Sequence, residues 1–208
     1  MSKLFTVGLT GQTGAGKSAV SALLRADGVP VIDCDKVSRQ VTEKGKPALF
    51  ALTEAFSPEI LTKTGELDRK ALGGIVFSDP AALVVLNRTI FPFIIRRIEE
   101  MCAALKEKGE TLVVLDAPTL FESGADKRCD YIIGVCAEES RRMARIIARD
   151  GLTEEEARSR INSQHTETFF REHCHSIIEN NGSQQALCEA VHGCIKRLLE
   201  VKDGRSHS

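Results

Sequence analysis

Apolar residues gather in four short runs that are typical of buried strands. The first two run from Leu4 to Leu9 and from Val29 to Ile32, and two more follow at Leu112–Leu115 and Tyr131–Val135. Between the first two, residues 18–27 have the apolar spacing of a helix that packs through one face. A strand, a helix and a second strand in this order predict a parallel sheet with helices on its faces, and therefore an α/β fold.

A long stretch without a strand pattern, from about Lys36 to Lys108, separates the second and third runs. It predicts mainly helices, which prolines and glycines interrupt, Pro92 among them. The last of these helices is the clearest, and one face of it predicts a core. Its apolar positions follow the helical repeat: Ile94, Ile98, Cys102 and Leu105.

A basic segment follows the fourth apolar run. Three arginines share one face of a helix predicted over residues 140–149: Arg142, Arg145 and Arg149. Asp150-Gly151 ends that helix, and Thr153 with Glu156 forms a capping box that begins another. Such a hairpin is able to close over a nucleotide with its arginines on phosphate oxygens. Charge alone favours the plainer interpretation, which is a solvated basic face.

The turn between the first strand and the first helix carries the most specific motif. Residues Gly11–Ser18 fit the phosphate-binding loop G-x-x-x-x-G-K-[ST], and their flanks are the strand and helix that such a loop requires. Its glycines allow backbone N–H groups at the helix start to point at phosphate oxygens. Lys17 adds a positive charge for the outer phosphates, and the hydroxyl of Ser18 is placed to bind a magnesium ion.

Carboxylates end two of the predicted strands. Asp33 and Asp35 follow the second strand, and Asp116 follows the third. The carboxyl ends of parallel strands meet at one edge of the sheet, so we expect these acids to face the phosphate loop. Asp116 resembles the second acidic motif of phosphate-loop proteins, which holds Mg²⁺ directly or through water. The alternative for each acid is a structural role, such as capping a helix.

Composition narrows the class of protein. Of 208 residues, 42% are hydrophobic and 27% charged, which suits one sizeable core. The formal net charge of -1 gives no general reason to expect nucleic acid or an anionic membrane as a partner. With no leader pattern and no run of about 18 apolar residues, we expect a soluble cytoplasmic protein. The seven cysteines lack C-x-x-C spacing and predict reduced, mostly buried thiols.

An ordered set of motifs resembles the dephospho-CoA kinase family. The set begins with Thr10–Ser18, Asp33-Cys34-Asp35 with Arg39, and Gly65-Glu66-Leu67-Asp68-Arg69. It continues through Val76-Phe77, Leu115–Pro118, Leu120–Glu122, Arg145, Arg149–Gly151, Gln164 and Asn180–Gly182. The resemblance spans about residues 4–183, and its acidic and Gly-x-Leu-Asp-Arg motifs are more particular to this family than the phosphate loop is.

The resemblance implies a reaction and its cofactors. ATP, with Mg²⁺, would phosphorylate the ribose 3′-hydroxyl of dephospho-CoA to give coenzyme A and ADP, the last step of coenzyme A biosynthesis. The fold implied is a three-layer phosphate-loop kinase in one domain. Its core would cover about residues 1–35, 110–138 and 174–201, its helical acceptor-binding region 36–109 and its lid 139–173. We expect a monomer or weak homo-oligomer without a nucleic-acid or membrane partner.

The resemblance also implies roles for individual residues. The catalytic set would be Asp33, as base or orienter of the hydroxyl, with Lys17, Arg145 and Arg149. The nucleotide set would be Gly11, Gly14, Ala15, Gly16, Lys17, Ser18, Ala19, Asn180 and Asn181, although a turn-forming role is as well supported for the two asparagines. The acceptor set would be Asp33, Asp35, Arg39, Asp68 and Arg69, and the metal ligands Ser18 and Asp116.

Departures from the family pattern and two alternatives accompany this interpretation. Phe91 stands where the family usually has histidine, and Thr119 replaces the more usual leucine. A phosphate-loop kinase for a nucleoside monophosphate, or another small hydroxyl acceptor, would keep the loop, the acids and the lid. A nucleotide-binding regulatory module of the GTP-binding type would need the guanine-reading Asn-Lys-x-Asp, which this sequence lacks.

Overall fold

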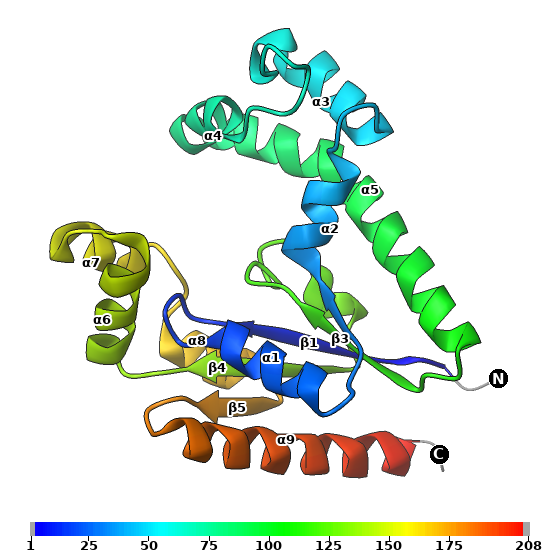
Figure 1. Cartoon of the computed structure of the whole chain (residues 1–208), viewed down its shortest axis with the longest axis vertical. Coiled ribbons are helices and arrows are strands. Elements are labelled where there is room, and N and C mark those ends of the chain that lie inside the picture. The colour runs from blue at the N-terminus through cyan, green and yellow to red at the C-terminus, as the bar shows by residue number, and fades with distance from the viewer. Residues whose placement is uncertain (1–2, 206–208) are drawn as a thin grey trace. The chain divides into compact units, whose positions relative to one another are not determined.

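The computed structural model describes residues 3–205 (Figure 1). The chain forms two compact units. One contains the chain up to Val31 and from Gly109 onwards, and the other is Ile32–Lys108. The functional regions expected from the sequence stay a prediction, because this division reports compactness and not function.

A five-stranded sheet organises the fold, with strand order β2-β3-β1-β4-β5. Its strands are β1 (Phe5–Gly11), β2 (Val31–Asp33), β3 (Leu112–Asp116), β4 (Tyr131–Cys136) and β5 (Ser176–Glu179). β1 pairs in parallel with β3 and with β4, and β4 pairs in parallel with β5. This arrangement confirms the predicted α/β fold and brings the carboxyl ends of β1 and β3 to the same edge.

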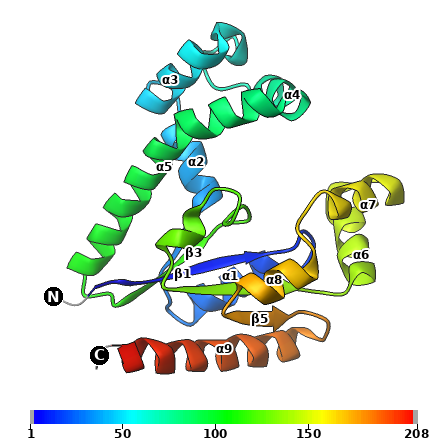
Figure 2. The same cartoon turned by 180° about the vertical axis from the view of Figure 1, so that it is seen from behind.

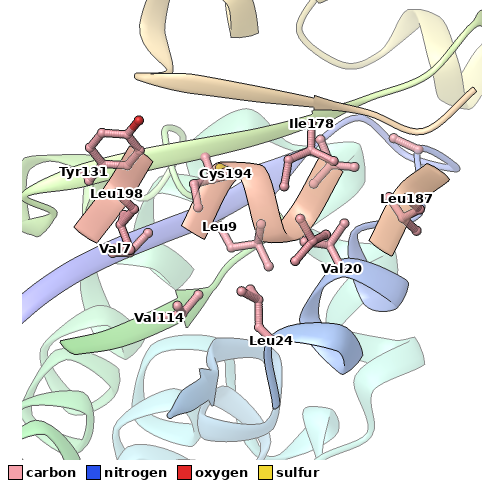
Figure 3. Packing of buried hydrophobic residues seen from close by; sticks show 14 of the residues in the cluster. Val7, Leu9, Val20, Leu24, Val114, Tyr131, Ile178, Leu187, Cys194 and Leu198 are labelled. Atoms are coloured by element: carbon pink, nitrogen blue, oxygen red, sulfur yellow. The ribbon is translucent and has the colours of Figure 1, made fainter. Parts of the chain in front are cut away.

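Helices cover both faces of the sheet in the first unit. α1 (Lys17–Ala26) and α9 (Gln184–Arg205) share one apolar core with the strands, in which Val20, Leu24 and Leu198 are buried (Figure 3). α8 (Glu167–His173) contacts β4 and β5, and it lies behind the sheet in Figure 1 and in front of it in Figure 2. Successive side chains of a strand point to opposite faces of the sheet. Because helices cover both faces, the apolar runs of these strands are nearly continuous.

The second unit is helical. Its elements are α2 (Cys34–Val41), α3 (Pro47–Phe56), the short 3₁₀ helix η1 (Pro58–Ile60), α4 (Arg69–Ser78) and α5 (Pro80–Glu107). α2, α3 and α4 each contact α5. A separate core unites them, with Leu52 and Ile60 fully buried. Phe91 packs against this core, so an apolar residue at the position of the family's usual histidine has an apolar environment.

Pro92 corrects the expected helix boundaries. The sequence placed an interruption there, but Pro92 lies inside the 28-residue helix α5. An internal proline removes one helical hydrogen bond and costs roughly 3 kcal/mol. Packing of three helices along α5 offsets such a cost, and the helix bends along its length in Figures 1 and 2.

The predicted helical hairpin is present. α6 (Glu139–Asp150) and α7 (Glu154–Asn162) pack around Ile146, Ala157 and Ile161. Thr153 and Glu156 form the expected capping box at the start of α7. A second 3₁₀ helix, η2 (Ala125–Arg128), lies between β3 and β4. We refer to residues Glu139–Asn162 as the lid hairpin, after the role that the family resemblance implies for them.

The cysteines are free thiols, two of them buried and five half-buried. Burial raises the pKa of Cys129 and of Cys174 to about 12, so both thiols are protonated at neutral pH. Among residues 3–205, none of the helices combines the length and apolar character needed to cross a membrane.

Candidate active site

The phosphate loop has a backbone that only glycine adopts readily. Gly14 and Gly16 have φ values of 75° and 95°. A Cβ on Gly14 would lie 2.7 Å from the Arg142 carbonyl oxygen, and one on Gly16 would lie 2.2 Å from Asn180 Nδ2. The two glycines therefore permit both the turn of the loop and the close approach of α6 and of the segment after β5.

Side chains from distant segments hold the carbonyl groups of this loop. Arg142 Nε donates to the Thr13 carbonyl at 3.0 Å, and Arg145 Nη1 donates to those of Gly14 and Ala15 at 3.2 Å. Asn180 Nδ2 also donates to the Ala15 carbonyl, at 2.8 Å. Each of these three carbonyl groups is thus bound from outside the loop.

The amide groups of the loop have the opposite environment. Within residues 3–205, the backbone N–H groups of Gly14, Gly16, Lys17 and Ser18 have no hydrogen-bond acceptor. They lie at the N-terminus of α1, where the helix dipole adds positive potential. Backbone donors at a helix start, with the carbonyl groups held away, form an anion-binding cradle.

Lys17 and Asp116 meet at the edge of the sheet. Lys17 Nζ donates to Asp116 Oδ1, and the two side chains are 15% and 8% exposed. Ser18 is exposed at the start of α1. Ser18 and Asp116 offer a hydroxyl and a carboxylate oxygen, which are donors of the type that Mg²⁺ prefers when water and phosphate complete its shell. The chemistry of this donor set fits the expected metal.

The lid arginines occupy two different environments. Arg145 is half-buried and, besides the loop, donates through Nη2 to the Asn180 carbonyl at 3.0 Å. Arg149 is exposed and makes two 2.8 Å hydrogen bonds to Asp150, which also pairs with Arg160. The hydrogen bonds to Asp150 raise the pKa of Arg149. The solvated-face interpretation thus describes Arg149 but not Arg145.

Asn180 and Asn181 support the loop and the lid hairpin through their side chains. Asn180 is buried against the loop, as described above, and its N–H donates to the Cys136 carbonyl at 2.9 Å. Asn181 Oδ1 accepts from the N–H of Glu138, which lies at the N-cap position of α6, at 2.8 Å. Ala19 lies exposed on α1 and donates its N–H to the Gly16 carbonyl. A role for the asparagines toward adenine stays a prediction.

Asp33, at the end of β2, and Asp35, on α2, belong to the second unit. Asp33 caps α2, since its Oδ1 accepts from the Lys36 N–H at 2.9 Å, and its Oδ2 lies 4.0 Å from Lys36 Nζ. Asp35 and Arg39 are exposed on α2. The structural alternative for Asp33, a capping carboxylate, is therefore real. The cap occupies Oδ1, whereas Oδ2 has only the weak 4.0 Å contact with the exposed Lys36 amine.

Asp68 and Arg69 lie at the start of α4. Asp68 caps this helix through the N–H groups of Lys70 and Ala71. Arg69 Nη2 donates to Thr42 Oγ1 at 2.8 Å, and its pKa is lowered, first by burial and then by the positive charge of Arg39. Within the described chain no carboxylate pairs with Arg39 or Arg69. Two neighbouring guanidinium groups without an acidic partner suit an anionic ligand.

Two contacts to the loop were missed from the sequence. Arg142 shares a helical face with Arg145 and Arg149, but its 4% exposure and its bond to Thr13 were not foreseen. Gln164 was part of the family resemblance without a role, and its Oε1 accepts from the Thr13 N–H at 2.7 Å. The sequence held two signals: the spacing of Arg142 with the other two arginines, and the place of Gln164 in the family resemblance.

Comparison with known proteins identifies the family of this chain. The dephospho-CoA kinase family matches residues 5–186. A dephospho-CoA kinase of Enterococcus faecalis is 37% identical over 199 residues, which cover 96% of this chain and 98% of that protein.

Two solved structures extend the agreement to three dimensions. TT1252 from Thermus thermophilus has a TM-score of 0.83 at 35% identity, covering 95% of this chain and 99% of that one. Dephospho-CoA kinase from Campylobacter jejuni has a TM-score of 0.67 at 26% identity, with coverage of 96% and 98%. With its family match over most of its length and these relatives, this chain belongs to the dephospho-CoA kinase family.

Proposed function

We propose that this protein transfers the γ-phosphoryl group of ATP to the ribose 3′-hydroxyl of dephospho-CoA, giving coenzyme A and ADP. One observation carries the proposal beyond family membership. The loop Gly11–Ser18 has three carbonyl groups held from outside and four N–H groups without an acceptor in the described chain, beside the amine of Lys17. That arrangement binds the phosphates of a nucleotide.

The loop and the lid arginines would position and stabilise the transferred group. The N–H groups of the loop bind phosphate oxygens, and Lys17 exchanges its contact with Asp116 for the outer phosphates. Arg145 already lies beside Gly14 and Ala15. The N–H groups of its guanidinium that are not used there would therefore lie near the phosphate oxygens bound by the loop. Arg149 would leave Asp150 to reach the nucleotide, an exchange between two exposed partners that costs little.

Ser18 and Asp116 would hold Mg²⁺ in this proposal. The bound ion supplies positive charge that offsets the charge of the phosphate oxygens during transfer. Asp116 is buried at the end of β3, and its neighbours in the sheet fix its position. Ser18 presents its hydroxyl from the first turn of α1.

Asp33 would bind the hydroxyl group of the acceptor. Its Oδ1 is occupied by the cap of α2, so Oδ2 would accept the hydrogen bond of the ribose 3′-hydroxyl. The hydroxyl oxygen forms a bond to the γ-phosphorus, the bond between that phosphorus and the bridging oxygen breaks, and ADP leaves. The proton of the hydroxyl passes to Asp33 or, if Asp33 only orients the group, to solvent.

The other acceptor contacts would come from the same helical unit. Arg39 and Arg69 bring two positive charges together, and we propose that they bind the negatively charged diphosphate of dephospho-CoA. Asp35 and Asp68 are proposed for polar contacts to the same molecule. Asp68 also caps α4, so its carboxylate would have to make the contact with the substrate while it keeps the cap.

Product analysis tests this function. Purified protein with ATP, Mg²⁺ and dephospho-CoA is expected to give one equivalent of ADP per equivalent of coenzyme A. Phosphorus NMR should place the new phosphate on the 3′ oxygen. ADP formation at the same rate without dephospho-CoA, or a phosphate on another oxygen, would contradict the proposal.

A further inference from the structure

Thr13 is held on both of its polar backbone groups by side chains from outside the loop. Its N–H donates to Gln164 Oε1 at 2.7 Å. Its carbonyl accepts from Arg142 Nε at 3.0 Å. These partners lie 151 and 129 residues further along the chain, so the two contacts depend on the fold.

One partner lies in the first turn of a packed unit, and the other lies just beyond the end of that unit. Arg142 lies in the first turns of α6, and Gln164 follows the end of α7. Between them the lid hairpin is joined by its own core of Ile146, Ala157 and Ile161. Figure 2 shows α7 leading through a linker to α8, beside the loop that follows β1. Thr13 is therefore the loop residue that both ends of the hairpin hold.

Such contacts matter because the loop contains three glycines. Glycines at 11, 14 and 16 leave several backbone conformations open to it. A nucleotide binds only the conformation that presents the N–H groups together, and its apparent affinity falls in proportion to the population of that conformation. A contact that fixes Thr13 raises this population.

We propose that Gln164 is a positioning residue of the phosphate loop: through the Thr13 N–H it fixes the loop in its nucleotide-binding conformation and joins that conformation to the lid hairpin. The inference rests on the proposed nucleotide site at Gly11–Ser18. Gln164 need not touch ATP to act in this way. Its amide oxygen accepts the hydrogen bond without bringing a negative charge close to the phosphates.

Two variants separate the hydrogen bond from the charge. Gln164→Ala removes the acceptor. Gln164→Glu keeps an acceptor oxygen but adds a negative charge that repels a triphosphate. Ser163→Ala is the matched control, since Ser163 lies in the same linker and its hydroxyl contacts only the Arg160 carbonyl, at 3.0 Å, in the described chain.

The first measurement is the hydrogen-exchange rate of the Thr13 amide, monitored by NMR in the absence of nucleotide. Gln164→Ala is expected to speed this exchange by about tenfold, the loss expected of one hydrogen bond. Gln164→Glu and Ser163→Ala should keep it close to the wild-type rate. Exchange that is equally slow in Gln164→Ala would overturn the inference, because the contact would not hold the loop.

The second measurement is ATP affinity by calorimetry, with steady-state kinetics and thermal unfolding. Gln164→Ala should raise the Kd and KM of ATP about tenfold while the KM of dephospho-CoA and the Tm stay close to wild type. Gln164→Glu should also lower the affinity for ATP, because its negative charge repels the triphosphate. A lower Tm with equal losses for both substrates would reveal a purely structural role and overturn the inference. Failure of the wild-type protein to bind ATP would instead refute the proposed function, and this inference with it.

Discussion

Lys17 donates a hydrogen bond to Asp116, which lies 99 residues later in the chain, and both side chains are largely buried. The pair joins the start of α1 to the end of β3. It brings the positive charge of the phosphate loop and the acid proposed for the metal to one place. Each charge compensates the other, so a change to either residue is expected to affect both activity and stability.

Replacing Lys17 with methionine should show both effects. Lys17→Met is expected to lower kcat/KM by about 10²- to 10³-fold, because a preorganised positive donor is lost from the phosphates. It should also lower the free energy of unfolding by about 3–5 kcal/mol, because Asp116 is left as a buried, unpaired charge. Steady-state kinetics and urea unfolding measure the two changes.

The control is another lysine ion pair on the surface. Lys3 contacts Asp130 at 2.7 Å with 79% of its side chain exposed, so Lys3→Met should change the free energy of unfolding by less than about 1 kcal/mol. Comparable losses in the two variants would contradict the importance assigned to the buried pair.

Asp33→Asn tests the acid at the acceptor hydroxyl without removing the helix cap, since asparagine caps as well as aspartate does. We expect kcat to fall by about 10²- to 10⁴-fold, because general base catalysis is lost, with ATP affinity little changed. Asp79 caps α5 in the same way and has no proposed part in the reaction, so Asp79→Asn is the control. A kcat of Asp33→Asn within about threefold of wild type would rule out the catalytic role.

Two glycines with similar φ values separate backbone strain from steric contact. Gly14 and Gly28 have φ of 75° and 78°, but a Cβ at Gly14 would meet α6 whereas one at Gly28 would meet nothing within 4 Å. Alanine at Gly28 should cost roughly 1–2 kcal/mol of stability through backbone strain alone. Alanine at Gly14 should cost more, because its Cβ would also meet the backbone of Arg142. Only Gly14→Ala should also weaken ATP binding, measured by calorimetry. Equal ATP affinity in both variants would show that the packing of α6 on the loop is unimportant.

Acid should weaken the lid hairpin through Glu156. Its pKa is lowered from the ordinary 4.5, first by the hydrogen bond from the Thr153 N–H and then by that from the Thr153 hydroxyl, both 2.8 Å. A lowered pKa means that the carboxylate contributes stability above about 4.5, and that this contribution is lost as pH falls through the lowered value.

NMR titration of the carboxyl groups checks this prediction. Thr153→Ala should move the pKa of Glu156 toward 4.5 and speed amide exchange in α7, whereas Glu155→Gln, a change at the neighbouring residue, should leave the pKa of Glu156 in place. A Glu156 that titrates normally in the wild-type protein would refute the capping box as a source of lid stability.

Much of the sheet and its edge was predictable. Strands β1, β3 and β4 are buried on both faces, so their apolar runs were unambiguous, and the loop motif placed Lys17 and Ser18 at the start of α1. Pro92 was misinterpreted because local propensity marks proline as an interruption, whereas the packing of α2, α3 and α4 on α5 decided the outcome.

The support of the loop was not predictable for a different reason. Arg142 and Gln164 bind the carbonyl and the N–H of Thr13, and every residue except proline has both of these backbone groups. No side-chain pattern therefore identifies the partner. Asp33 shows the opposite difficulty, since a capping acid and a catalytic acid look the same in sequence, and in the structure it does cap α2.

Comparison of acceptors tests the central claim most directly. ADP formation should be measured in one coupled assay with dephospho-CoA, AMP, CMP and adenosine, at fixed ATP and Mg²⁺. We predict a kcat/KM for dephospho-CoA at least about 100-fold above that of each other acceptor, corresponding to about 2.7 kcal/mol of transition-state discrimination. Faster turnover of AMP or CMP than of dephospho-CoA would contradict the account and identify a nucleoside monophosphate kinase.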